Sequence, residues 1–273
     1  MRTSLCGLLL ALLFQPVFAA EQPRLVVLAP NLVELLFSIG AGEQIVATTD
    51  FADYPEQAKQ LPRVGNFQGV QLETIVALKP DYVLYWRSGS RAGDIETLNR
   101  LGIKTIGFEP KVPADLIAIL KQLGVLSGHT AKANELALEV KRRLADIANR
   151  YQTQRQLPVF YEIWHEPLTT IGSNDWPAHA LRLCGAVSVP SLETPYPQLS
   201  IEVLLLTPPM LIIQPSSVNE PRPYVDYSRW PVLAQLPVIT ADADKLHRAT
   251  MRTLDGIEQL CQQIEQHRQR LEH

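Results

Sequence analysis

Short, continuously apolar runs alternate along the chain with segments of helical periodicity. In the first half these runs and helical segments lie at 24–29, 31–40, 45–49, 72–79 and 82–86. Strands that are apolar throughout and separated by helices are typical of a parallel sheet covered on both faces. The pattern predicts an α/β lobe over residues 22–128, with Asn31 as the N-cap of its first helix.

The longest helical pattern of the chain follows this lobe. Residues 130–152 contain neither glycine nor proline, and their apolar positions are Leu136, Leu138, Val140, Leu144 and Ile147. A helix of this length spans roughly 30–35 Å at 1.5 Å per residue. We therefore predict a helix over 129–153 that links two lobes.

The alternation of apolar runs and helical segments returns in the second half of the chain. It predicts a second α/β lobe over residues 156–273. The expected fold class is α/β, with two Rossmann-like lobes of parallel sheet, one long α-helix joining them, and a ligand cleft between them.

An internal repeat relates the two predicted lobes. Residues 67–80 (FQGVQLETIVALKP) align without a gap with residues 196–209 (YPQLSIEVLLLTPP). The alignment pairs Phe67 with Tyr196, Glu73 with Glu202, and Pro80 with Pro209. A duplicated lobe predicts a pseudo-two-fold molecule whose cleft lies between the halves.

Aromatic residues recur where the predicted strands end. Trp86 closes a strand, and in open α/β sheets ligands bind at the carboxyl ends of the strands. Phe51, Phe67 and Tyr196 occupy loops that we place at the same edge. Flat rings suit a large planar apolar ligand. The alternative is that these rings cap the cores of the lobes.

Glu73 and Glu202 each fall in the first turn of a predicted helix. A carboxylate is favourable there because it faces the positive end of the helix dipole, which is explanation enough for either one alone. The repeat adds a second interpretation, in which each lobe presents one acidic residue to a two-fold symmetric basic partner.

The first residues read as a secretory signal peptide. Arg2 precedes an apolar run at 5–14, and small residues follow it. We predict a signal peptide over 1–19, removed on export. Two cysteines then remain, Cys184 and Cys261, and an exported chain favours a disulfide over two free thiols.

Composition and motifs exclude several classes of function. The formal net charge of the 273 residues is -3, which argues against a nucleic-acid partner. No G-x-G-x-x-G follows the first strand, and neither a P-loop nor a nucleophile with its base is evident, so we expect no enzyme and no bound cofactor. The six histidines are scattered, and we expect no metal site in the protein itself.

Residues 72–89 (LETIVALKPDYVLYWRSG) strongly resemble the periplasmic cobalamin-binding proteins of bacterial ABC importers, and the wider resemblance runs from residue 24 to 261. The resemblance implies a periplasmic monomer that captures cobalamin and delivers it to an inner-membrane permease dimer with its ATPase subunits. It assigns Glu73 and Glu202 to docking on the permease, and Cys184 and Cys261 to the disulfide of the family.

The resemblance also implies a ligand site. Its expected members are Phe51, Phe67, Trp86, Trp164, Tyr196, Asp244, Lys245, Leu246, His247 and Arg248. Four of these depart from the family pattern: Phe51 replaces a tyrosine, Phe67 and Tyr196 replace tryptophans, and Lys245 replaces a further aromatic. The departures put the identity of the ligand in doubt more than the class.

Haem and iron-siderophore receptors of the same class are the alternative, since Arg87, Arg91 and Arg248 could meet an anionic ligand. His165 or His247 could then coordinate the metal of the ligand. An enzyme on a Rossmann-like fold is the remaining alternative.

Overall fold

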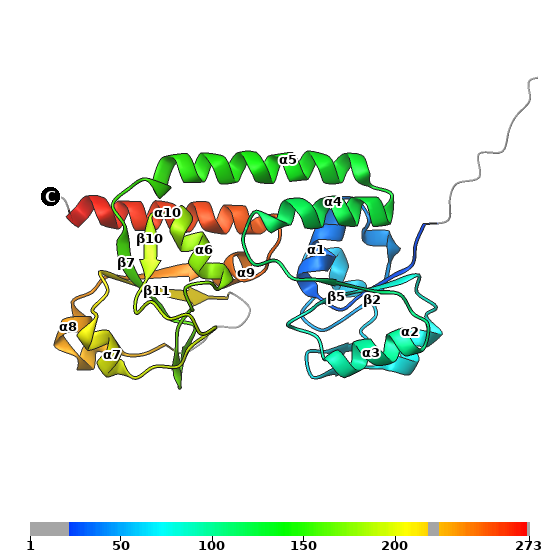
Figure 1. Ribbon diagram of the computed structural model, residues 1–273, viewed down its shortest axis with the longest axis horizontal. Coiled ribbons are helices and arrows are strands. Elements are labelled where there is room, and N and C mark those ends of the chain that lie inside the picture. The colour runs from blue at the N-terminus through cyan, green and yellow to red at the C-terminus, as the bar shows by residue number, and fades with distance from the viewer. Residues whose placement is uncertain (1–21, 218–223, 272–273) are drawn as a thin grey trace, which may run out of the picture.

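The computed structural model describes residues 22–217 and 224–271, and the predicted signal peptide lies outside them. Two α/β lobes lie side by side, each built on a four-stranded parallel sheet (Figure 1). The predicted fold class is confirmed. Within the described residues, no helix is both long and apolar enough to cross a membrane.

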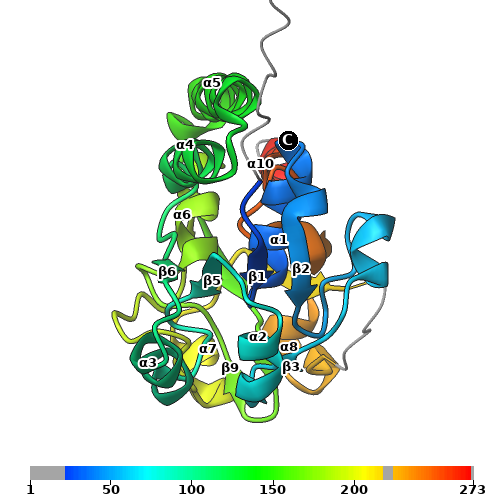
Figure 2. The ribbon, with the colours of Figure 1, turned by 90° about the vertical axis from the view of Figure 1, so that its right-hand side faces the viewer.

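The N-terminal lobe has the strand order β2-β1-β5-β6. Its strands and helices are β1 (Leu25–Val27), α1 (Pro30–Ser38), β2 (Ile45–Thr48), α2 (Leu72–Ala77), β5 (Tyr82–Trp86), α3 (Ala92–Arg100), β6 (Thr105–Phe108) and α4 (Asp115–Ser127). Figure 2 shows the strands between α1 and α4 above and α2 and α3 below. Alternate side chains of β1 therefore enter different cores: Leu25 and Val27 pack on the side of α1, and Val26 on the other.

The C-terminal lobe repeats this arrangement with the order β10-β7-β11-β12. Its elements are β7 (Leu157–Tyr161), α6 (Trp176–Leu183), β10 (Ala186–Ser188), α7 (Ile201–Leu206), β11 (Leu211–Ser216), α8 (Pro231–Ala234), β12 (Val238–Asp242), α9 (Ala243–Leu246) and α10 (Arg252–Leu271). Two small hairpins complete the described chain, β3 (Gly65–Asn66) with β4 (Gly69–Val70), and β8 (Trp164–His165) with β9 (Leu168–Thr169).

The linking helix is α5 (Thr130–Ile147), which a π-helical turn continues over Ala148–Gln152. It crosses from one lobe to the other along the top of the molecule (Figure 1). Its buried face is Ala133, Leu136, Ala137, Val140 and Ile147. Leu138, which the sequence placed on the apolar face, is exposed because it lies on the opposite side of the helix from Leu136.

A second helix also spans both lobes. Leu254, near the start of α10, packs in the core of the N-terminal lobe, whereas Leu260 and Ile264 pack in the core of the C-terminal lobe. Arg143 of α5 pairs with Asp255 and Glu258 of α10 at 2.7 and 2.9 Å, which ties the two helices together. The predicted linking helix is therefore present, and α10 holds the lobes together in addition to it.

The predicted disulfide is confirmed. Cys184 follows the last residue of α6, and its sulfur is bonded to that of Cys261 in α10. Both residues are fully buried. The bond fixes α10 to the first helix of its own lobe.

Candidate functional site

A cavity of about 450 Å³ lies between the lobes, a volume typical of small-molecule sites. Phe51, Asp53 and Phe67 line it from the N-terminal lobe. The C-terminal lobe contributes Ile163, Pro215, Ser217, Ala243, Asp244, His247 and Arg248. The cavity lies between the two lobes, as the cleft was predicted to, and five of the ten expected ligand residues line it.

Two loop aromatics on the cleft side of the lobes adopt a strained backbone. Phe51 has φ 65° and Tyr196 has φ 44°, both in the left-handed region, and Lys79 is the one other non-glycine residue with positive φ in the described chain. Such a conformation costs about 1–3 kcal/mol in a non-glycine residue and clusters at functional sites. Phe51, Tyr196 and also Phe67 are 54%, 50% and 71% exposed. The folded chain thus exposes these rings to solvent, and at Phe51 and Tyr196 it does so at the cost of backbone strain.

Tyr196 does not line the interlobe cavity. Its backbone N–H donates to Oδ2 of Asp175 at 2.9 Å, which fixes the loop. Burial raises the pKa of its hydroxyl, and the charges of Asp175 and of Glu109 in the N-terminal lobe raise the pKa further.

Trp86 combines the two roles that the sequence left open. Its ring packs against the main core of the N-terminal lobe, and Nε1 donates to Oγ of Ser88 at 2.7 Å. Trp86 also lines a smaller cavity of about 190 Å³ within that lobe, together with Phe51 and Phe67. It is therefore both a core residue and a cavity wall.

Trp164 lies on the β8–β9 hairpin and is 40% exposed. Its Nε1 donates to the carbonyl of Glu166 at 2.9 Å, and its ring lies 5.6 Å from that of His165. The cavity lining includes its neighbour Ile163 but neither Trp164 nor His165.

The segment 242–248 divides between the cavity and the lobe interior. Asp244, His247 and Arg248 line the cavity, as expected. Lys245 instead pairs with Asp242 at 3.2 Å, and Leu246 is 1% exposed in the core. The helical turn formed by α9 and its C-cap His247 explains the difference, because positions 244, 247 and 248 are three and four residues apart and lie on one side of that turn, away from Lys245 and Leu246.

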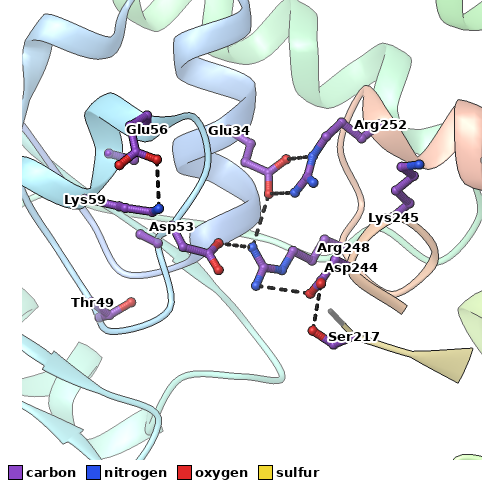
Figure 3. Close-up of polar contacts among 12 residues, drawn as sticks. Glu34, Thr49, Asp53, Glu56, Lys59, Ser217, Asp244, Lys245, Arg248 and Arg252 are labelled. Carbon is purple, nitrogen blue, oxygen red and sulfur yellow. Dashed lines mark hydrogen bonds and ion pairs between the residues drawn. The ribbon is translucent and has the colours of Figure 1, made fainter. Parts of the chain in front are cut away.

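Figure 3 shows that an ion-pair network joins the lobes at the edge of the cavity. Arg248 pairs with Asp53 at 2.5 Å, with Glu34 at 3.4 Å and with Asp244 at 3.6 Å. Arg252 binds both carboxylate oxygens of the buried Glu34, at 2.9 and 2.6 Å. Burial opposes the ionisation of Asp53, but the hydrogen bond and the charge of Arg248 outweigh it, so the pKa of Asp53 is lowered.

Sequence reasoning missed two buried carboxylates in this region, Glu34 and Glu162. Glu162 accepts hydrogen bonds from the N–H of Val225 at 2.8 Å, the hydroxyl of Tyr227 at 2.7 Å and the amide of Gln214 at 3.0 Å. It thereby anchors a loop next to Ile163. The signal was present, since each glutamate interrupts an otherwise apolar run.

His247 is engaged by the C-terminal lobe, because the hydroxyl of the buried Tyr161 lies 2.9 Å from its Nε2. Burial raises the pKa of Tyr161 well above its ordinary value. In the described part of the chain, no group of three or more His, Cys, Asp or Glu side chains is placed to hold a metal ion.

Glu73 and Glu202 are not part of the cavity lining and are exposed in the first turns of α2 and α7. Both helices lie on the side of the molecule opposite α5, one in each lobe (Figures 1 and 2). A hydrogen bond from Ser200 lowers the pKa of Glu202.

A family model of periplasmic binding proteins matches residues 25–223. The chain belongs to this family. The Vitamin B12-binding protein of Vibrio campbellii is 31% identical over 266 residues, 96% of this chain and 97% of that protein. The protein of the same name from Vibrio vulnificus is 33% identical over 249 residues, 89% and 90% of the two chains.

Solved structures show the same fold. The periplasmic Vitamin B12 binding protein BtuF of Vibrio cholerae superposes with a TM-score of 0.81 at 29% identity, over 90% of this chain and 98% of that one. The periplasmic heme-binding protein HutB of the same species gives a TM-score of 0.75 at 19% identity, over 89% and 99%. The family resemblance expected from the sequence is confirmed, and the family is one of binding proteins rather than enzymes.

Proposed function

We propose that this protein is exported to the periplasm, captures a corrinoid such as cobalamin between its lobes, and delivers it to a membrane ABC permease. The observation that carries the proposal is the interlobe cavity beside the exposed rings of Phe51 and Phe67. The corrin macrocycle is large, flat and mostly apolar, and the rings of Phe51 and Phe67 can pack against one of its faces. The Vitamin B12-binding relatives support this ligand class.

The remaining residues of the site fall into two groups. Trp86, Trp164 and Tyr196 extend the aromatic surface around the cavity. Asp244, His247 and Arg248 form its polar edge and orient the periphery of the ligand. Lys245 and Leu246 support this edge from behind, since neither lines the cavity.

Haem or a ferric siderophore is the alternative ligand. Tyr161 and His247 are residue types that bind haem iron, but Tyr161 is fully buried behind His247. A haem propionate would also need a cation, and Arg248, which lines the cavity, already pairs with three carboxylates. Both features favour the corrinoid.

Glu73 and Glu202 are proposed to dock on basic residues of a two-fold permease dimer that works with its ATPase subunits, the binding protein itself being a monomer. Their support is that each lobe presents one exposed carboxylate on the same side of the molecule. One carboxylate per lobe matches the symmetry of such a partner.

Calorimetric titration of the mature protein with cyanocobalamin, haemin and a ferric siderophore tests the proposal. We expect tight one-to-one binding of cyanocobalamin and weak or no binding of the other two. Binding of haemin alone would contradict the corrinoid assignment and leave the family intact.

A further inference from the structure

The smaller cavity inside the N-terminal lobe adjoins the interlobe cavity. The rings of Phe51 and Phe67 line both. With about 190 Å³ against about 450 Å³, the inner cavity is too small for a macrocycle and has room for a side arm. A planar ligand held against these two rings could therefore place one peripheral arm in it.

Asn31 lines this inner cavity and has an unusual position. It is 3% exposed, and its amide nitrogen has no hydrogen-bond partner among the described residues. The N-cap role expected from the sequence would have paired its side chain, but α1 begins at Pro30 with Ala29 as N-cap. Buried polar groups are nearly always paired, so this amide requires an explanation.

The charges around the cavity restrict what can enter it. Asp50, Asp94 and Arg91 also line the cavity. Asp50 accepts from the amide of Asn66 at 3.3 Å, Asp94 accepts from the N–H of Val70 at 3.3 Å, and Arg91 donates to the carbonyl of Gln68 at 2.9 Å. Two carboxylates against one guanidinium leave an excess of negative charge, which disfavours an anionic arm.

A primary carboxamide can pair both with the amide of Asn31 and with a carboxylate of the cavity. It carries a carbonyl acceptor and two N–H donors, so it can form a reciprocal pair with the amide of Asn31, whichever way that amide is turned. Its remaining N–H can donate to a carboxylate such as Asp50. A carboxylic arm offers acceptors alone: it can accept from the amide N–H of Asn31, but it has no N–H for the oxygen of that amide and it meets the negative charge of Asp50 and Asp94.

We propose that this cavity, lined by Asn31 and Asp50, is a subsite for one carboxamide arm of the ligand and discriminates against a carboxylate in its place. The inference rests on the proposed corrinoid function. It adds a basis for selectivity, because a corrinoid carries carboxamide arms around its ring where haem carries propionates.

The test is calorimetric titration of the Asn31→Leu protein and the unsubstituted protein with cyanocobalamin and with its monocarboxylic acids, each of which has one propionamide hydrolysed. We expect the unsubstituted protein to bind one acid about 10- to 100-fold more weakly than cyanocobalamin, because its carboxylate cannot donate to Asn31 and is repelled by Asp50 and Asp94. Asn31→Leu should lose affinity for cyanocobalamin by a similar factor and should distinguish that acid less strongly, the remaining difference coming from the charge of Asp50 and Asp94.

Thermal unfolding of the free proteins separates this role from a structural one. Leucine is nearly isosteric with asparagine and removes an unpaired buried amide, so Asn31→Leu should unfold at the same temperature or higher. The matched control is Asn149→Leu, an exposed position beyond α5, which should leave binding of every corrinoid unchanged.

A second variant probes the charge. Asp50→Asn should narrow the preference for cyanocobalamin over the discriminated acid, whereas Asp146→Asn on α5 should leave it intact.

Equal binding of all the acids by the unsubstituted protein would overturn the subsite while the proposed function stands, as would an Asn31→Leu protein with unchanged affinity. Failure of the unsubstituted protein to bind any corrinoid would overturn the proposed function and the subsite with it.

Discussion

Single residues around the cleft are held in conformations or environments that folding alone does not favour. Phe51 and Tyr196 adopt left-handed backbone, and Asn31 is buried without a partner for its amide nitrogen. Each lies in or near the proposed site. Ligand contacts would offset these local costs, which is the usual reason for such features to persist.

Replacing Phe51 should therefore separate stability from binding. Phe51→Gly removes the strain of φ 65°, so the free energy of unfolding should stay unchanged or rise by up to about 1 kcal/mol. Phe51→Ala keeps the strain. Both variants should bind cyanocobalamin at least about 10-fold more weakly, since both lose the ring. Urea unfolding and calorimetry measure the two quantities, and undiminished affinity in either variant would remove Phe51 from the site.

Asp53 should contribute to the pH dependence of stability. Its pKa is lower in the folded than in the unfolded chain, so the unfolded chain binds more protons and stability rises with pH. The contribution is complete above about pH 5, where the unfolded carboxyl is almost fully ionised, and is lost as the pH falls through the lowered native pKa. The measurement is the melting temperature from about pH 2.5 to 6. Asp53→Asn should reduce the fall of the melting temperature at acid pH, whereas Asp146→Asn on α5 should leave it as it is.

At the scale of elements, α10 connects the two lobes. It starts in the core of the N-terminal lobe, lies along α5, and ends in the C-terminal lobe, where the disulfide fixes it. Two helices side by side resist hinge bending more than one would. We therefore infer that the lobes move little relative to one another.

Removal of the disulfide tests the anchoring of α10. The bond closes a loop with a sequence separation of 77, and its loss should lower the free energy of unfolding by about 2–5 kcal/mol. Cys184→Ala combined with Cys261→Ala should melt at a lower temperature than the oxidised protein. A reducing agent should lower the melting temperature of the oxidised protein alone, and an effect on the double variant would show that the agent acts elsewhere.

For the whole molecule, the internal repeat has a three-dimensional counterpart. The helices α2 and α7 occupy equivalent places in the two lobes, and both lie on the side of the molecule away from α5. The cleft lies between the lobes, so the protein can hold the ligand in the cleft while both lobes contact a partner. This arrangement matches delivery to a symmetric permease.

Combined Glu73→Ala and Glu202→Ala substitutions should leave cyanocobalamin affinity unchanged and abolish uptake, because docking loses both acidic contacts. The measurement is uptake of labelled cobalamin by cells that carry the transporter. Glu96→Ala with Glu193→Ala, which also removes one exposed carboxylate per lobe, is the matched control. Full uptake by the first pair would contradict the docking assignment.

The sequence by itself determined the two α/β lobes, the linking helix and the repeat, because these follow from local periodicity and from residues matched between halves. It also indicated the disulfide, because an exported chain with two cysteines favours one. It also held the signal for α1, since proline is favoured at the first helical position and Pro30 displaces the cap from Asn31.

Only the tertiary structure decided which polar groups meet. Glu34 and Arg252 are 218 positions apart and form a bidentate pair, which no local pattern encodes. The division of segment 242–248 between cavity and core depends on how α9 packs. Whether α10 contacts both lobes depends on where that helix begins. Long-range packing also buries Asn31 in a cavity wall, because its environment is set by strands and loops that return to it from elsewhere in the chain.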